Sequence, residues 1–502
     1  MSQAQNDHLP FLKDAYHRIR QSASSTTAPL PTPQQLSAAR ASLPNPADPN
    51  YLSSRGIQAT LDHLLNDIAP ALNGQNQSSR YWGFVTGGSL PIAEIADNIV
   101  SAYDQNVSVH LPGQSIATEV EDAALKMLIK LLDLGEADVW EGRTFTTGAT
   151  GSNTLGLACG REGVIQAKLP AGADGVGELG ILAACLKAGI KEIQVLTSMG
   201  HSSLSKAASV VGLGRSSVKE LPYSADEPWR LDLVAVEREL KREGVASIIS
   251  VSAGEVNTGR FATTGKQDME KLRVLADRHG AWIHVDGAFG IFARALPATK
   301  EFARLREYTG GLELADSITV DGHKLLNVPY DCGMFFTRKA SVLTSVCKNP
   351  NAAYLSSGAS DIQSPLNVGL ENSRRFRALP AYAVLLSEGR EKIAEILTRT
   401  VRLTRGIAEG IRASDDFVLL PDEDANIEDT HIIVLFRAKD DSLNDVLVDA
   451  INKGREWYVS GTSWNGKKAV RIAVSNWRVD EAADLEVVKR SLKRIVQEYK
   501  SA

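Results

Sequence analysis

Hydrophobic and polar positions alternate in a regular way through the middle of the chain. Short runs rich in β-branched and aromatic residues are separated by longer segments with apolar residues at helical spacing. Strands and helices that alternate in this way predict a mostly parallel β-sheet with helices on both faces. The six runs are RTFTT (143–147), EIQVLT (192–197), ASIISV (246–251), AWIHV (281–285), SITV (317–320) and GMFF (333–336).

Both ends of the chain depart from this alternation. Residues 1–78 contain short amphipathic segments and a linker rich in serine, threonine and proline, which indicate a helical arm that lies on another surface. Residues 381–502 start with a long helical stretch and continue with short strands and helices, which predicts a small α+β domain. Residues 79–380 hold the alternating pattern and are predicted to form a large domain.

Composition narrows the class of protein. The chain of 502 residues is 43% hydrophobic and 23% charged, which is ordinary for a globular protein. A formal net charge of −5 disfavours nucleic-acid binding, which normally needs a basic face. No apolar run is long enough to cross a membrane, and the N-terminus lacks the apolar core of a signal peptide. Four cysteines without CxxC spacing favour reduced thiols, a cytoplasmic location and no metal site.

Three of the expected strand ends carry residues suited to ligand binding, and open parallel sheets bind their ligands there. TTGATGSNTLGL follows run 143–147, and its small residues and helix start suit an anion, although it is neither a Walker A nor a Rossmann sequence. His201 follows run 192–197, and Asp286 follows run 281–285. Taken singly, each feature also fits a structural role as a helix cap or a salt bridge.

The pair His323-Lys324 follows the run SITV in a short polar turn. A partly desolvated lysine can act as a nucleophile that forms a Schiff base, whereas a lone lysine in a loop is usually a surface residue. An anion cradle, a flat ring, a carboxylate and a lysine together suit pyridoxal 5′-phosphate (PLP). Its phosphate would lie at the helix start, its ring on His201, its ring nitrogen at Asp286 and its aldehyde on Lys324.

Six segments resemble, in order, motifs of the group II pyridoxal-dependent amino-acid decarboxylases, the family of aromatic-L-amino-acid, histidine and glutamate decarboxylases. The resemblance runs from about Arg80 to Arg377, with a weaker match at VRIAVSNWR. It implies an aspartate-aminotransferase-like α/β domain (PLP fold type I) and a homodimer with active sites shared across the interface. The segments are RYWGFVTGGSLP, TTGATGSNTLGL, GHSSLSKAA, IHVDGAFG, DGHKLLNVPYDCG and NSRRFRALPAY.

The resemblance also implies roles for single residues. Phe84 and Thr86 match positions that border the substrate in the family. The threonine-rich segment of the family is replaced here by GEVNTG (254–259), so the contact to the cofactor O3′ is expected from Asn257. The other implied cofactor contacts are Ala149 and Thr150 at the phosphate, His201 and Ala288 at the ring, Asp286 at the ring nitrogen, and His323 and Lys324 at the aldehyde.

The reaction expected from the resemblance is decarboxylation of an L-amino acid to an amine and CO2. Tyr354-Leu355, within 348–365, matches a Tyr-Leu pair on a mobile loop of the family. This match implies that Tyr354 delivers the proton to Cα, so Tyr354 joins Lys324 and His201 as an expected catalytic residue.

The aromatic side chains of Tyr81, Trp82 and Phe84 suggest an apolar pocket and favour an aromatic substrate such as tyrosine, tryptophan or dopa. Three other activities fit the same motifs: decarboxylation of a non-aromatic amino acid, aldehyde synthesis and transamination by another fold type I enzyme. A catalytically inactive scaffold is a fourth alternative, which the complete pair of Asp286 and Lys324 disfavours.

Overall fold

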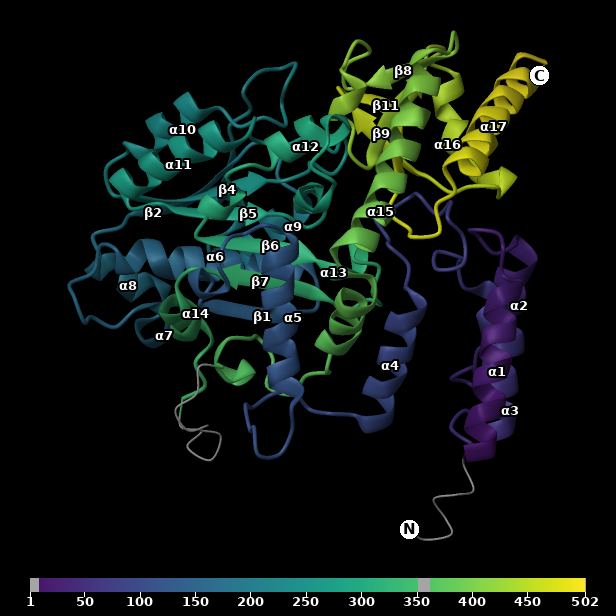
Figure 1. Cartoon of the computed structure of the whole chain (residues 1–502), viewed down its shortest axis with the longest axis horizontal. Helices are drawn as coiled ribbons and strands as arrows, with labels where there is room; N and C mark the ends of the chain where they lie inside the picture. Colours follow the sequence, from purple (N-terminus) through teal and green to yellow (C-terminus); the bar gives the residue numbers. More distant parts are fainter. Residues whose placement is uncertain (1–8, 351–361, 502) are drawn as a thin grey trace.

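A large β-sheet forms the centre of the molecule (Figure 1). The computed structural model describes residues 9–350 and 362–501, and the structural statements below concern these ranges. Seven strands are arranged in the order β1-β7-β6-β5-β4-β2-β3. They are β1 (Gly142–Thr146), β2 (Glu192–Thr197), β3 (Val218–Glu220), β4 (Val245–Ser252), β5 (Trp282–Asp286), β6 (Ser317–Asp321) and β7 (Gly333–Thr337).

Every strand of this sheet except β7 runs in the same direction. The neighbours from β6 to β3 pair in parallel, whereas β7 is antiparallel to both β6 and β1. The carboxyl ends of β1, β2, β4, β5 and β6 therefore meet at one edge. The reversal of β7 follows from the short connection after β6, because parallel pairing needs a long crossover. The prediction of a mostly parallel sheet is confirmed.

Helices cover both faces of the sheet (Figure 1). Side chains alternate along β4 and β5: Ile248 and Trp282 join the hydrophobic cluster that contains α6, whereas Ile249 and Ile283 join the cluster on the opposite face. The helices of this domain are α4 (Pro91–Tyr103), α5 (Ala117–Leu131), α6 (Ala149–Gln166), α7 (Val176–Leu179), α8 (Ile181–Lys187), α9 (Ser202–Val210), α10 (Leu233–Leu240), α11 (Lys266–His279), α12 (Ala303–Tyr308), α13 (Gly322–Leu325) and α14 (Ala340–Cys347).

A smaller antiparallel sheet lies beside the large one, in the strand order β10-β11-β9-β8. The long helix α15 (Ala378–Arg412) runs between the two sheets and is kinked at Gly389, whose φ of 59° suits glycine. The other elements are β8 (Phe417–Leu420), β9 (Ile433–Ala438), β10 (Ser460–Trp464), β11 (Lys467–Ala473), α16 (Leu447–Gly454) and α17 (Glu481–Ser501). These elements form the small α+β unit that the sequence predicts.

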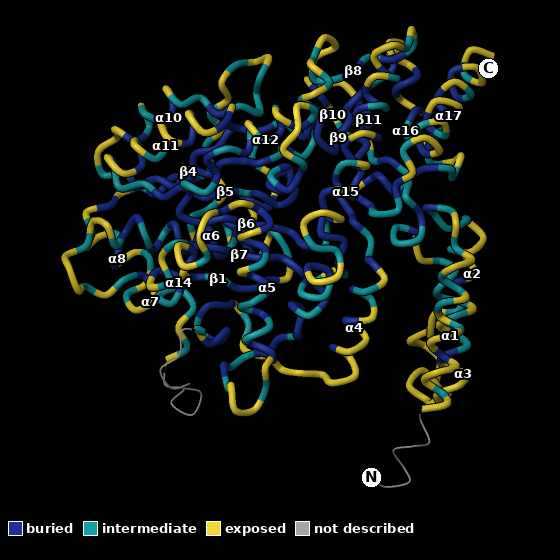
Figure 2. Tube along the Cα trace, viewed as in Figure 1, coloured by how far each residue is buried: buried dark blue, intermediate teal, exposed yellow. Residues whose placement is uncertain are grey.

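The N-terminal helices stand apart from the body as an arm, drawn in purple in Figure 1. The arm contains α1 (Leu9–Ser25), α2 (Pro33–Ser42) and α3 (Ile57–His63), and each helix buries a single residue. Figure 2 shows that most of its surface is exposed. An ion pair of 2.8 Å between Arg20 and Glu94 ties the arm to α4. Within the described ranges, no helix has both the length and the apolar character needed to cross a membrane.

A buried histidine lies where the two sheets meet. His431, just before β9, is 1% exposed, and neither ring nitrogen has a hydrogen-bond partner among the described residues. Its ring packs against Phe261 and Phe289, with centroid distances of 6.3 and 6.5 Å. Burial lowers its pKa to about 3, so the ring is neutral near neutral pH.

This burial predicts a dependence of stability on pH. Between pH 6.5 and pH 3 the unfolded chain binds a proton at His431 that the folded chain does not bind. The free energy of unfolding therefore decreases as the pH is lowered through this range. From pH 8 to pH 5 we expect this residue to remove about 2 kcal/mol of stability. His431→Leu should lack this contribution, so urea unfolding at both pH values should show a smaller difference than in the wild type. An equal difference in the two proteins would contradict the assignment.

Candidate active site

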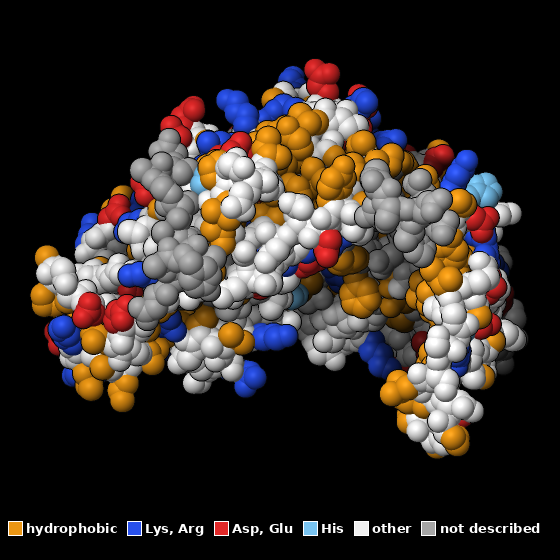
Figure 3. Space-filling view, turned by 90° about the horizontal axis from the view of Figure 1, so that it is seen from below, with side chains coloured by type: hydrophobic (Ala, Val, Ile, Leu, Met, Phe, Trp, Pro, Cys, Tyr) orange, Lys and Arg blue, Asp and Glu red, His pale blue; other side chains and the backbone are white. Residues whose placement is uncertain are grey.

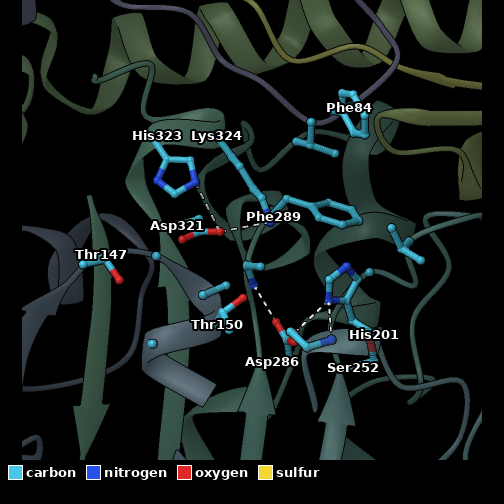
Figure 4. A pocket seen from close by; sticks show the side chains of 18 of the residues that line it. Phe84, Thr147, Thr150, His201, Ser252, Asp286, Phe289, Asp321, His323 and Lys324 are labelled. Carbon is cyan, nitrogen blue, oxygen red and sulfur yellow. Dashed lines mark hydrogen bonds and ion pairs between the residues drawn. The ribbon is translucent and has the colours of Figure 1, made fainter. Parts of the chain in front are cut away.

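A cavity of about 420 Å³ lies at the carboxyl ends of the parallel strands, with its floor on the large sheet and one wall from the small sheet. Each of β1, β2, β4, β5 and β6 contributes lining residues from the segment that follows it (Figure 4). Cavities of a few hundred Å³ are typical of sites for small ligands. The expected residues that line it are Phe84, Ala149, Thr150, His201, Asp286, Ala288, His323 and Lys324.

Lys324 reaches this cavity from the turn that follows β6. Its Nζ forms an ion pair of 3.0 Å with Oδ2 of Asp321 and lies 5.8 Å from the centre of the Phe289 ring. The preceding residue is anchored, because Nδ1 of His323 lies 3.1 Å from the carbonyl oxygen of Cys332. Gly87 packs on the other side of the turn, where a Cβ atom would lie 1.7 Å from the carbonyl oxygen of Lys324. The lysine is therefore held by its backbone, while its amine faces the cavity.

Asp286 ends β5 at the floor of the cavity, and its carboxylate already has two donors. Asn153 on α6 donates to Oδ2 at 2.8 Å, and the backbone N–H of Ala288 donates to Oδ1 at 3.2 Å. Hydrogen bonds to a carboxylate stabilise its charged form. Asp286 is thus suited to face a protonated nitrogen of a ligand ring.

A buried chain of hydrogen bonds supports Asn153 from behind. Trp282 Nε1 donates to Ser317 Oγ at 2.9 Å, and Ser317 Oγ lies 2.8 Å from Nδ1 of His284. Nε2 of His284 lies 3.0 Å from the amide oxygen of Asn153. Since indole only donates and the amide nitrogen of Asn153 donates to Asp286, the chain has one consistent direction from Trp282 to Asp286. Burial lowers the pKa of His284 to about 4, which keeps its imidazole neutral.

The chain of hydrogen bonds depends on a close approach between α6 and β5. A Cβ atom at Gly156 would lie 2.2 Å from Cε1 of His284, and one at Gly163 would lie 2.6 Å from the Trp282 ring. Glycine at these positions therefore lets the helix lie directly on the two strand residues. The segment TTGATGSNTLGL therefore contains the predicted helix start and also Gly156, which allows this tight packing.

The start of α6 forms an anion cradle. Gly148, Ala149, Thr150 and Gly151 line the cavity, and Gly148 makes no side-chain cap to the helix. The first N–H groups of an 18-residue helix are therefore available to an anion, which the helix dipole also attracts.

His201 stands at the start of α9 and lines the cavity. Its Nδ1 accepts a hydrogen bond of 3.1 Å from the backbone N–H of Ser203, which fixes the ring. Burial lowers the pKa of His201, although Asp286 acts in the opposite direction. A neutral flat ring, a carboxylate, an anion cradle and a lysine amine thus surround one cavity, and this set of groups fits PLP.

Two residues expected at the site, Asn257 and Thr86, are not among the described residues that line the cavity. Asn257 is not among the lining residues, and its amide oxygen accepts a hydrogen bond of 2.9 Å from Thr462 on β10. Thr86 lies beside the lining residue Val85, and its hydroxyl is buried without a partner among the described residues. Tyr354 and Leu355 lie outside the described residues.

The expected aromatic pocket needs a correction. Trp82 is fully buried in the core of the small domain, 5.8 Å from Trp457, and Tyr81 packs 4.7 Å from Tyr458. Their backbone is bound there as well, because Trp82 N donates to the carbonyl oxygen of Tyr458 at 2.8 Å. Of the three aromatic residues, Phe84 alone lines the cavity. Sequence proximity was misleading because a bridge at Tyr81 binds the segment to the small domain, and the backbone then bends at Gly83 and Phe84.

Arg471 is a cavity residue that the sequence did not single out. It lies on β11, and its Nε and Nη1 donate to the carbonyl oxygens of Val256 and Gly83 at 2.5 and 3.1 Å. Burial lowers its pKa to about 10, so it stays charged at neutral pH. Its motif, VRIAVSNWR, was visible, but its place at the cavity depends on the docking of the small sheet.

The fold and the cavity together define a PLP-dependent enzyme of fold type I. A family model described as "Pyridoxal-dependent decarboxylase conserved domain" matches residues 60–439. The chain therefore belongs to the pyridoxal-dependent decarboxylase family, and it is a PLP-dependent amino-acid decarboxylase.

Relatives of known function differ in the amino acid that they act on. L-2,4-Diaminobutyrate decarboxylase of Acinetobacter baumannii is 26% identical over 381 residues, which cover 73% of this chain and 68% of that protein. Tryptophan decarboxylase 1 of Oryza sativa subsp. japonica is 24% identical over 458 residues, which cover 85% and 82%. Family membership thus establishes the cofactor and the class of reaction, and the aromatic substrate needs its own argument.

Solved structures share the fold along the whole chain. The glutamate decarboxylase domain of diaminobutyrate-pyruvate transaminase and L-2,4-diaminobutyrate decarboxylase from Vibrio parahaemolyticus has a TM-score of 0.78 at 23% identity, with 99% of this chain and 97% of that chain covered. Oryza sativa TDC with PLP and tryptamine has a TM-score of 0.78 at 21% identity, with the same coverage. The predicted fold class is confirmed.

The packing of α6 on β5 predicts that Gly156→Ala is destabilising. The added methyl group would meet the ring of His284, which is held by hydrogen bonds on both sides, and we expect a loss of about 1–3 kcal/mol in the free energy of unfolding. Gly410→Ala in α15 is the matched control, because the nearest atom to its added methyl group would be Cε of the flexible Lys489 side chain, at 3.8 Å. Urea unfolding measures both variants, and equal stabilities would contradict the proposed tight contact.

Proposed function

We propose that this enzyme releases the α-carboxylate of an L-amino acid as CO2, with Lys324 as the residue that carries the cofactor. One observation supports this most strongly: Asp286 ends β5, Lys324 follows the adjacent strand β6, and both line the same cavity. When bound, PLP supplies an electron-accepting ring that is conjugated with Cα of the substrate.

Each of the surrounding residues has a separate task in this proposal. Asp286 holds a negative charge at the ring nitrogen and keeps that nitrogen protonated. His201 stacks on one face of the ring, and Ala288 packs on the other face. The remaining contacts are those of Ala149 and Thr150 to the phosphate, of His323 beside the lysine, and of Phe84 and Thr86 near the substrate.

An aromatic substrate is our first choice. The cavity wall includes the side chains of Phe84, Val85, Val256, Phe289 and Tyr330, which offer apolar surface to a substrate ring. Aromatic side chains gain most from such contacts, so tyrosine, tryptophan and dopa are the proposed substrates.

Arg471 favours a second candidate, an amino acid with a distal carboxylate. A buried guanidinium at the cavity pairs well with a carboxylate. Two of its N–H groups are already bound to backbone carbonyl oxygens, which leaves fewer donors for a substrate and ranks this candidate second.

The enzyme acts as a homodimer with shared active sites in this proposal. The arm and α4 expose apolar side chains, and Figure 3 shows hydrophobic side chains gathered on the face seen from below. Exposed apolar surface of this kind commonly marks a protein interface. A monomer in analytical ultracentrifugation would contradict the proposal. The exposed residues are Leu9, Leu12, Tyr16 and Ile19 on α1, and Ile95, Ile99 and Tyr103 on α4.

We also propose a cytoplasmic location and the division of the chain into 1–78, 79–380 and 381–502. The four cysteines are free thiols, and Cys159 and Cys332 are buried. Burial raises the pKa of both thiols, which disfavours the reactive thiolate.

A panel of L-amino acids tests the proposed function. Purified protein with PLP is incubated with tryptophan, tyrosine, dopa, glutamate, aspartate and 2,4-diaminobutyrate, and CO2 and amine are measured. We expect equal amounts of CO2 and amine from the aromatic substrates. We expect Lys324→Ala to lose the visible absorbance of the bound cofactor and at least about 10³-fold in kcat/KM.

Other outcomes of the panel point to the alternatives. Turnover of the acidic amino acids or 2,4-diaminobutyrate alone would overturn the aromatic assignment. Aldehyde in place of amine would indicate an aldehyde synthase, and accumulation of the pyridoxamine form without CO2 would indicate an aminotransferase.

Tyr354 is proposed as the acid that delivers the proton to Cα. Replacing a general acid lowers a rate by about 10²–10⁴-fold, so Tyr354→Phe should lower the yield of amine relative to CO2. Tyr223→Phe is a matched control, since Tyr223 is exposed and packs against Arg230 at 4.1 Å. The ratio of amine to CO2 is the measurement, and an unchanged ratio in Tyr354→Phe would reject this role.

A further inference from the structure

Asp321 is a buried carboxylate at the cavity, and one of its two oxygens has no hydrogen-bond donor among the described residues. Its side chain is 3% exposed, and Oδ1 is buried without a hydrogen-bond partner among the described residues. Although Asp321 is the residue before α13, its side chain makes no cap to that helix. A buried carboxylate oxygen without a donor is unfavourable, so this side chain is suited to a partner that the protein itself does not supply.

The two oxygens of Asp321 face two different parts of the site. Oδ2 forms the ion pair of 3.0 Å with Nζ of Lys324. Oδ1 lies toward the anion cradle, 3.6 Å from the position that a Cβ atom of Gly148 would take. Figure 4 shows Asp321 between Lys324 and His323. The carboxylate thus connects the nucleophilic amine with the place proposed for the phosphate.

The titratable groups around Asp321 are His323, Tyr330, Cys332 and His201, and Nε2 of His323 lies 3.6 Å from Oδ2 of Asp321. Burial lowers the pKa of His323, and Nδ1 of this ring is bound to the carbonyl oxygen of Cys332. Burial raises the pKa of Tyr330 and of Cys332, and the charge of Asp321 raises both further, so both groups stay neutral. The charge of Asp321 also acts on His201, where it raises the pKa against the larger effect of burial. Asp321 is therefore the carboxylate in direct contact with the lysine amine.

We propose that Asp321 accepts the proton that Lys324 must lose before its amine can bind the cofactor aldehyde. This inference rests on the proposed attachment of the cofactor to Lys324. An ammonium group has no free electron pair, so deprotonation precedes nucleophilic attack. Asp321 is a catalytic residue for cofactor capture, a step that the decarboxylation cycle itself does not contain.

One N–H bond of Lys324 breaks, one O–H bond forms on Asp321, and the electron pair stays on Nζ. Nζ then forms the carbon–nitrogen double bond to the aldehyde carbon, and the aldehyde oxygen leaves as water with the two remaining amine hydrogens. The third proton stays on Asp321, which is then neutral and can donate from Oδ1 to the phosphate. Protonation thereby removes the repulsion between two anions at the cradle.

Asp321→Asn separates this role from a structural one, because asparagine has nearly the same shape and can still donate to a phosphate. Full-length protein freed of cofactor is mixed with PLP, and the growth of visible absorbance is followed from pH 7 to pH 9. The wild-type rate should change by less than about threefold, because the proton stays within the pair. The rate of Asp321→Asn should rise about tenfold per pH unit, because its amine must lose the proton to solvent.

Two controls identify the source of any change. Pyridoxamine 5′-phosphate has no aldehyde, so its Kd should agree within about threefold between wild type and Asp321→Asn. Asp331→Asn removes a carboxylate from the same turn, where Asp331 pairs with Arg377 at 3.3 Å, and should keep the wild-type rates. The backbone φ of Asp331 is 72°, a conformation that asparagine also tolerates.

Equal pH dependence in wild type and Asp321→Asn would overturn the inference. Loss of pyridoxamine 5′-phosphate binding in Asp321→Asn would overturn it as well, since Asp321 would then only shape the site. If Lys324→Ala gains the same visible absorbance as the wild type, the proposed attachment at Lys324 fails, and the inference fails with it. If Lys324→Ala stays colourless and Asp321→Asn matches the wild type, the inference alone fails.

Discussion

The close packing of α6 on β5 is the constraint on which the site depends. Glycine at position 156 lets the helix lie against His284, and this contact brings Asn153 within hydrogen-bond distance of Asp286. The same helix presents its first N–H groups to the cavity. One contact between a helix and a strand therefore places both the carboxylate for a ring nitrogen and the cradle for an anion. A larger residue at position 156 would disturb the two together.

The parallel sheet supplies the rest of the arrangement, and this part was predictable from the sequence. Lys324, His201 and Asp286 each follow a run of β-forming residues, and parallel strands bring such positions to one edge. The strands that the sequence did not indicate, β3 and β10, lie at sheet edges. β3 has three residues and β10 reads SGTSW, so neither carries the apolar pattern of a central strand.

Residues whose roles depend on packing between distant segments were harder to predict. Asn257 had the right position in the chain, but the small domain binds its side chain through Thr462. Asp321 stands close to His323 and Lys324 in sequence, yet only the structure shows that its Oδ1 has no hydrogen-bond donor among the described residues. Arg471 reaches the cavity from another sheet altogether. Local pattern indicates which strand ends carry chemistry, whereas the partners of each side chain come from tertiary structure.

The small domain thus contributes residues to the cavity as well as stability to the fold. Its β11 contributes Arg471 to the cavity, and His431 packs against Phe289, whose ring lies below the amine of Lys324. Arg471 and His431 are both buried where the sheets meet. A buried charge is unfavourable without close packing, and so is the imidazole of His431, which has no hydrogen-bond partner among the described residues. The interface is therefore stable only when the sheets are docked closely. Because the walls of the cavity come from both sheets, the same docking that buries these groups also forms the site.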